Sequence, residues 1–211
     1  MFFDKPLQAL FFDPLLDMWS VSGEQVSLRL LFYSIPKGIF GTIVALLFVR
    51  AFLIQKGGRS LIVATAIVLS PILVALLKAA TGVECPKDLL LYGGMQGELP
   101  LLHAMSEGTG RCFPGGHVSA GFGLYALLSL IPSNRRGVAF VGITIVGHLM
   151  GFYQIARGYH FLSHNLATMG ISYSLYLFNE ILIQRFEGRL NLLLDIVRRP
   201  FAALLANKSF E

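Results

Sequence analysis

Charged residues are scarce in this sequence: they fill 14% of the 211 positions, while 55% of the residues are hydrophobic. A soluble domain of this length needs more charge on its surface, so a compact bundle of membrane helices is favoured over one soluble core. The net charge is +5, yet the basic residues fall in short clusters between apolar runs, and no basic face with interleaved aromatics occurs. This pattern argues against a nucleic-acid partner.

Cysteine is equally scarce, with two residues, and the five histidines are scattered. Neither set has a familiar metal-ligand spacing, so no metal site is predicted. The first 20 residues also lack an uninterrupted apolar run, because prolines and aspartates punctuate them. We therefore expect neither a cleavable signal peptide nor a span there, but an amphipathic segment over residues 1–30 at the membrane surface.

Five apolar stretches are long enough to be membrane spans, since a helix needs roughly 20 residues to cross. They lie at about 33–54, 61–79, 116–132, 138–157 and 165–184. The sequence thus predicts an all-α polytopic bundle of about five transmembrane helices within one membrane domain, 1–211. Its catalytic bundle is expected at 33–184, followed by an amphipathic tail at 185–211.

The charges of the connections predict an orientation. The 55–60 and 132–137 loops with their flanks, together with the tail, hold ten of the 17 basic residues and four acidic ones. The other side holds seven basic and eight acidic residues. By the positive-inside rule the first group is cytoplasmic. We expect a bacterial-type inner membrane protein whose other face meets the periplasm or the cell exterior.

Histidines and cations gather at three helix ends on that outer side. Lys78 ends the second span, Pro114-Gly115-Gly116-His117 opens the third, and a turn with Arg157, His160 and His164 joins the fourth to the fifth. Cleaving a phosphate ester requires donors for its oxygens, a nucleophile, and an acid for the leaving oxygen. Glycines allow close backbone approach to an anion, and histidine titrates near neutrality. A phosphate-cleaving site is therefore predicted.

These motifs resemble those of the type-2 phosphatidic-acid phosphatase family, membrane lipid phosphatases related to the vanadium haloperoxidases. The family pattern is Lys-x6-Arg-Pro, then Pro-Ser-Gly-His, then Ser-Arg-x5-His-x3-Asp. The resemblance covers roughly residues 60–184. It implies that Lys78 binds phosphate, that His117 protonates the leaving group, and that His160 is the nucleophile that becomes phosphorylated. The backbone at Gly115 and Gly116 would hold phosphate oxygens, and no metal or other cofactor is implied.

The chain departs from the family pattern at three positions. Cys85 stands where the first motif has arginine, and Gln154 stands where the third motif has arginine. Arg157 is the obvious substitute for the latter, and Arg111 is a further candidate for binding phosphate. His164 takes the place of the aspartate that orients the nucleophilic histidine; a neutral imidazole accepts the same hydrogen bond but supplies no negative charge.

Both cysteines, Cys85 and Cys112, fall in the same outer connection, and each adjoins a motif. An oxidising compartment permits a disulfide between them. Such a bridge would tie the first-motif loop to the segment before His117, in the place of the missing phosphate-binding arginine. We state it as a hypothesis.

Together, the motifs and their resemblance to this family predict a metal-independent lipid phosphatase that acts through a phosphohistidine. Its substrate is a phosphate monoester or diphosphate of a lipid, such as lipid A, a polyprenyl diphosphate or a phospholipid phosphate. Two alternatives stay open: a weak or inactive relative that binds phosphorylated lipid, and an enzyme that passes the phosphoryl group to another lipid. The oligomeric state is not predicted.

Overall fold

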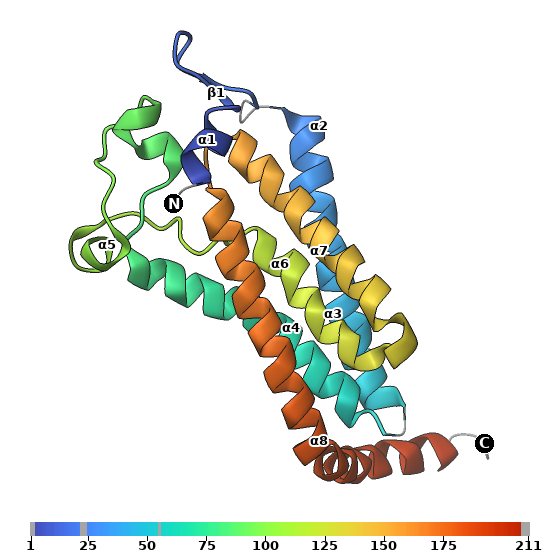
Figure 1. Cartoon of the computed structure of the whole chain (residues 1–211). Helices are drawn as coiled ribbons and strands as arrows, with labels where there is room; N and C mark the ends of the chain where they lie inside the picture. Colours follow the sequence, from blue (N-terminus) through green and yellow to red (C-terminus); the bar gives the residue numbers. More distant parts are fainter. Residues whose placement is uncertain (1–2, 22–24, 55, 208–211) are drawn as a thin grey trace.

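A computed structural model describes residues 3–21, 25–54 and 56–207 (Figure 1). The elements outside the long helices are α1 (Asp4–Gln8), a hairpin of β1 (Phe12–Asp13) and β2 (Met18–Trp19), 3-10 turns at Pro86–Asp88 and Leu90–Tyr92, and α5 (Leu101–Glu107). The remaining helical elements are α2 (Val26–Arg29), a π-helical turn at Leu30–Ser34, α3 (Ile35–Leu53), α4 (Gly58–Thr81), α6 (Val118–Gly123), a 3-10 stretch at Leu124–Leu130, α7 (Ser133–Ala156) and α8 (Leu162–Asn207).

Four helical segments of the described chain are long and apolar enough to cross a membrane: Val26–Leu53, Gly58–Asp88, Ser133–Ala156 and Leu162–Arg199. The chain is thus a membrane-embedded helical bundle, which confirms the predicted fold class. The stretch expected as the third span is shorter. It forms α6 and the 3-10 stretch that follows, which together cover Val118–Leu130.

This short segment lies inside the bundle because glycines let the helix backbones come close. A Cβ added at Gly121 of α6 would lie 2.9 Å from the Cα of Gly147 in α7, and one added at Gly147 would meet the Phe122 ring at 2.3 Å. The hydrophobic effect does not drive helices together within lipid, and small residues at such crossings permit the close van der Waals packing that does. Phe122 and Tyr125 are fully buried as a result.

Polar contacts join α8 to α4 and to the 3-10 stretch Leu124–Leu130 across the interior. The Ser70 and Ser172 hydroxyls lie 2.8 Å apart, and the Asn179 amide donates to the Ser129 hydroxyl at 3.0 Å. Such bonds between buried hydroxyls and amides link neighbouring helices within a membrane. They set the height of α8 against α4, which matters because both helices carry residues of the candidate site.

The sequence suggests a separate tail after the last span, but α8 continues without interruption to Asn207. Its final part bends and runs across the end of the bundle (Figure 1). There Arg59 pairs with Glu187 at 2.9 Å, and the Gly58 N–H donates to Asn191 at 2.7 Å. This end of α8 is therefore docked onto the start of α4.

The N-terminal segment is expected from the sequence to be an amphipathic segment at the membrane surface. It forms α1 and the hairpin, which cover the opposite end of the bundle (Figure 1). Phe12 and Trp19 pack on a buried cluster of Leu89, Tyr92 and Phe161. The prolines that interrupt the apolar pattern keep any helix here short, because an interior proline removes a helical hydrogen bond.

Candidate functional site

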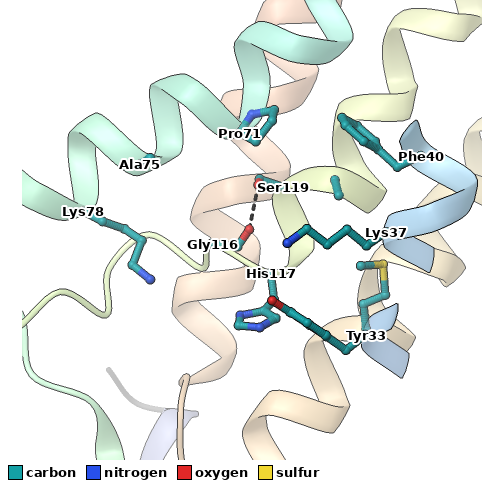
Figure 2. A pocket seen from close by; sticks show the side chains of 11 residues that line it. Tyr33, Lys37, Phe40, Pro71, Ala75, Lys78, Gly116, His117 and Ser119 are labelled. Carbon is teal, nitrogen blue, oxygen red and sulfur yellow. Dashed lines mark hydrogen bonds between the residues drawn. The ribbon is translucent and has the colours of Figure 1, made fainter. Parts of the chain in front are cut away.

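Three chain segments bring the candidate residues together at the covered end of the bundle. Lys78 lies in the last turn of α4, a helix that ends at Gly82, whose φ of 62° suits glycine. His117 immediately precedes α6, and His160 lies in the turn before α8. Figure 2 shows Lys78 and His117 approaching Gly116 from different sides.

The imidazoles form a row. The ring centroids of His117 and His160 are 6.2 Å apart, and those of His160 and His164 are 5.7 Å apart. His160 is 2% exposed and His164 is fully buried, whereas His117 is partly exposed and lines a cavity. His117 therefore stands between the cavity and the buried pair.

Lys78 lies against the glycine loop. A Cβ added at Gly116 would lie 3.2 Å from the Lys78 Nζ, so the absence of a side chain there permits this approach. The Ser119 hydroxyl donates to the Gly116 carbonyl at 2.6 Å and holds the loop in place.

Gly115 differs from its sequence-based role. Its N–H donates to the His164 carbonyl at 3.0 Å, so this amide already has a partner within the chain. The Thr168 hydroxyl donates at 3.0 Å to the Gly115 carbonyl. Gly115 thus fixes the loop onto α8, and Gly116 is the glycine that lines the cavity.

His117 and His160, which lie outside the spanning helices, have lowered pKa values. Burial is the main cause for His117, whose pKa falls to about 4, and the positive charges of Lys78, Arg157 and Lys37 lower it further. Burial also brings the pKa of His160 well below its usual 6.5. Both imidazoles are therefore neutral at pH 7 in the unliganded protein, and an anion beside them would favour the protonated form.

The two candidate arginines are placed differently. The Arg157 guanidinium carbon lies 5.2 Å from the Tyr153 ring centroid and 4.7 Å from that of Tyr159. This stacking holds its positive charge close enough to lower the pKa of His117. Arg111 is exposed, and neither arginine is among the residues that line the cavity beside His117.

A disulfide joins Cys85 to Cys112 with the Cα atoms 5.1 Å apart. Cys112 is 3% exposed, and its N–H donates to the Val83 carbonyl at 2.8 Å. The backbone at Cys112 partly opposes the fall in the pKa of His160. The bridge therefore holds a backbone segment that acts on His160.

A buried carboxylate that sequence reasoning missed lies beside the third motif. Asp4 of α1 is 3% exposed, and its Oδ1 accepts a hydrogen bond at 2.8 Å from the N–H of Ser163, the residue before His164. No sequence signal connects residues 159 positions apart. Gln154, at the other departure, is 1% exposed, and neither atom of its amide has a partner among the described residues.

Two further residues missed from the sequence line the cavity. Tyr33 lies with its ring centroid 4.8 Å from that of His117, and the Lys37 Nζ lies 5.3 Å from the Tyr33 ring centroid. The sequence feature that could have identified this part of the cavity is Lys37 itself, because a charged residue within an apolar span typically marks a functional position.

A neutral histidine pair next to a lysine at the end of a membrane bundle suits phosphoryl chemistry, and the class of protein these features define is a membrane-embedded phosphatase. The chain belongs to the PAP2 superfamily, because the model of that superfamily matches residues 59–185, more than half of the sequence. This confirms the resemblance seen in the motifs, and phosphatase-type activity on phosphorylated substrates follows from it.

The matched range contains Lys78, His117 and His160, and it leaves α1 and α3 outside. The roles of Asp4 and Lys37 are therefore not covered by family membership. Searches of curated proteins and of solved structures gave no match.

Proposed function

We propose that this protein hydrolyses a phosphate monoester or diphosphate of a membrane lipid through a phosphohistidine at His160. The observation that carries the proposal is the row of His117 and His160, with ring centroids 6.2 Å apart, beside Lys78 and a cavity. A phosphoryl group at this point meets a nucleophile, an acid and a cation together, which are the three aids that its transfer requires.

The reaction runs in two balanced steps. A lone pair of neutral His160 forms a bond to phosphorus, the bond from phosphorus to the lipid oxygen breaks, and protonated His117 gives its proton to that oxygen. Water then attacks the phosphohistidine while His117 takes back a proton, and phosphate leaves. The low pKa of His160 favours the first step, since it keeps the nucleophile unprotonated at pH 7. Burial is the main cause of the low pKa of His117, and Lys78, Arg157 and Lys37 lower it further. A bound phosphate anion offsets the effect of these cations and favours the protonated form of His117 that the first step requires.

The cavity favours a lipid as the substrate. Its volume is about 430 Å³. Apart from the charged and aromatic residues near His117, its wall is formed by apolar side chains of α3, α4 and α7, such as Phe40, Pro71 and Met150. An acyl or prenyl chain suits such a wall, whereas the hydroxyl groups of a sugar phosphate would lose their hydrogen bonds to water there.

The charge asymmetry of the sequence supports a location for the site. The basic loop at 55–60 and the docked end of α8 lie at the end of the bundle opposite His160 (Figure 1). If that basic end is cytoplasmic, the site lies at the outer face of an inner membrane.

Asp4 and His164 stand in for the aspartate of the third motif. His164 lies 5.7 Å from the His160 ring centroid, and Asp4 provides a buried negative charge at the residue before it. The carboxylate would act on His160 by way of His164, in the place of an aspartate that orients a catalytic histidine directly.

The test is release of inorganic phosphate from a panel of lipid phosphates by the purified protein in detergent micelles. We expect His160→Ala to reduce the rate by roughly 10³-fold or more, as loss of a nucleophile does. His103→Ala, at an exposed histidine of α5, is the matched control and should retain the wild-type rate. A chelator should leave the rate unchanged, and labelled phosphate should be trapped on His160 after acid-free quenching.

The three departures from the family pattern favour a second candidate, a protein that binds a lipid phosphate without cleaving it. This candidate predicts no phosphate release from any member of the panel, together with saturable binding that Lys78→Met weakens. The two measurements separate the candidates, because only the phosphatase gives a labelled histidine.

A further inference from the structure

The cavity beside His117 is lined by two lysines, and the family motifs account for one of them. Lys78 enters from α4 and Lys37 enters from α3. Figure 2 shows Lys37 extending across the cavity toward Gly116, while Lys78 lies on the other side of that glycine. A second cation at the same cavity calls for a second anionic group.

Among the described residues, Lys37 has no acidic partner that would account for a charge in this position. It lies within the spanning segment Val26–Leu53, and no salt bridge joins it to a carboxylate of the described residues. Its charge acts instead on the site, since it is one of the three cations that lower the pKa of His117. An unpaired cation within a span is costly and typically serves a ligand.

The lining residues are ordered along the membrane normal. The chain runs inward along α3 and outward along α4, so Phe40 lies deeper than Tyr33, and Pro71 lies deeper than Lys78. Figure 2 shows the same division, with Phe40 and Pro71 on the side opposite His117. The cavity thus has a polar outer part and an apolar inner part, which matches a lipid with its head group outward.

Within the polar part, three groups follow one another from the histidine pair inward. His117 lies between His160 at 6.2 Å and Tyr33 at 4.8 Å, measured between ring centroids. Lys37 is one helical turn further along the chain than Tyr33, with its Nζ 5.3 Å from that ring centroid. The lipid side of the scissile bond therefore meets a phenol and an ammonium group before it meets the apolar wall.

We propose that Tyr33 and Lys37 bind the inner phosphate of a lipid diphosphate, which makes the site selective for diphosphates over monophosphates. This inference rests on the proposed phosphatase function and deepens it. The outer phosphoryl group lies at His160 and Lys78, the inner phosphate lies at Tyr33 and Lys37, and the chain follows Phe40 inward.

The reaction balances as hydrolysis of an anhydride. His160 bonds to the outer phosphorus, the bond from that phosphorus to the bridging oxygen breaks, and His117 protonates the oxygen, which stays on the lipid monophosphate. Water then frees the outer phosphate. The charges also correspond: a diphosphate monoester carries up to three negative charges, and three cations, Lys37, Lys78 and Arg157, act on His117.

The experiment compares kcat/KM for farnesyl diphosphate and farnesyl monophosphate in the same detergent micelles. We expect wild type to prefer the diphosphate, and Lys37→Gln to reduce the ratio of the two kcat/KM values by about 10-fold or more, the range for a charged hydrogen bond. Lys37→Arg should restore most of the ratio. Tyr33→Phe should lower the ratio by a smaller factor.

Arg29→Gln is the matched control. Arg29 is an exposed cation of α2 in the same spanning segment, and it does not line the cavity. Its loss should leave the ratio unchanged. If Lys37→Gln and Arg29→Gln lower both activities equally, Lys37 serves contact with the lipid surface, and the inference is overturned.

The outcomes separate this inference from the function on which it rests. A wild-type protein that cleaves neither farnesyl compound nor any lipid phosphate of the panel defeats the phosphatase proposal itself. Cleavage of the monophosphate with an unchanged ratio in Lys37→Gln keeps the phosphatase and removes the diphosphate subsite.

Discussion

Replacing Cys85 and Cys112 with serine removes the one covalent link between the first-motif loop and the segment that leads to His117. The disulfide closes a loop with a sequence separation of 27. In the chain-entropy account, a loop of this length lowers the entropy of the unfolded chain by about 12 cal/mol/K, which corresponds to about 3.5 kcal/mol of stability at 25 °C. For a chain of this size the loss lowers Tm by roughly 7–14 °C.

The assay is thermal unfolding in detergent, with and without a phosphine reductant. Reduced wild type and the double serine variant should unfold at the same lowered temperature, and the reductant should not affect the variant. Phosphate release should fall as well, because the backbone at Cys112 acts on His160. A difference in Tm below about 1 °C is far smaller than this entropy predicts. Such a result, or two alkylatable thiols in the oxidised protein, refutes the reasoning.

Three further perturbations follow from the site. Asp4→Asn keeps an oxygen that caps α8 but loses the negative charge, so phosphate release should fall about 10-fold while stability changes by less than about 1 kcal/mol. Asp4→Ala removes the cap as well, which is worth about 1 kcal/mol, and equal stability losses in the two variants would show a purely structural role for Asp4. The pKa of His117 is about 4 in the folded protein and 6.5 in the unfolded chain, so the unfolded chain binds the proton first as pH falls. In denaturant titrations, His117→Gln should therefore lose about 3 kcal/mol less stability than wild type between pH 6.5 and pH 4, and the loss that remains includes the contribution of His160. Gly116→Ala places a methyl group 3.2 Å from the Lys78 Nζ, so kcat/KM should fall in this variant. Gly170→Ala is the control, because a methyl group at Gly170 meets open space, and its kcat/KM should stay unchanged.

The sequence predicts those parts of the molecule whose signals are local. Apolar runs mark the spanning helices, and the glycines before His117 mark a loop that allows close approach, which the Lys78 side chain makes at Gly116. His160 could be singled out because Arg157, His160 and His164 lie close together in the sequence, between Ala156 and Asn165. These features need no knowledge of which helices are neighbours.

The remainder depends on pairings that the sequence does not encode locally. The short α6 is stable inside the bundle because Gly121 meets Gly147, and that match exists only once α6 and α7 are packed. Asp4 reaches the start of α8 across a separation of 159 residues. The backbone partner of Gly115 likewise appears only when α8 lies against the loop.

The 46-residue helix α8 connects the two faces of the membrane. It begins two residues after His160, and its far end is docked onto α4 by Glu187 and Asn191. A bilayer thicker or thinner than its apolar length changes the tilt of such a helix. Both ends of α8 are held, since Asp4 and the Gly115 loop bind its first turn, so a change in tilt acts on the contacts around His164. We therefore expect the alignment of the imidazoles to respond to the acyl-chain length of the host membrane.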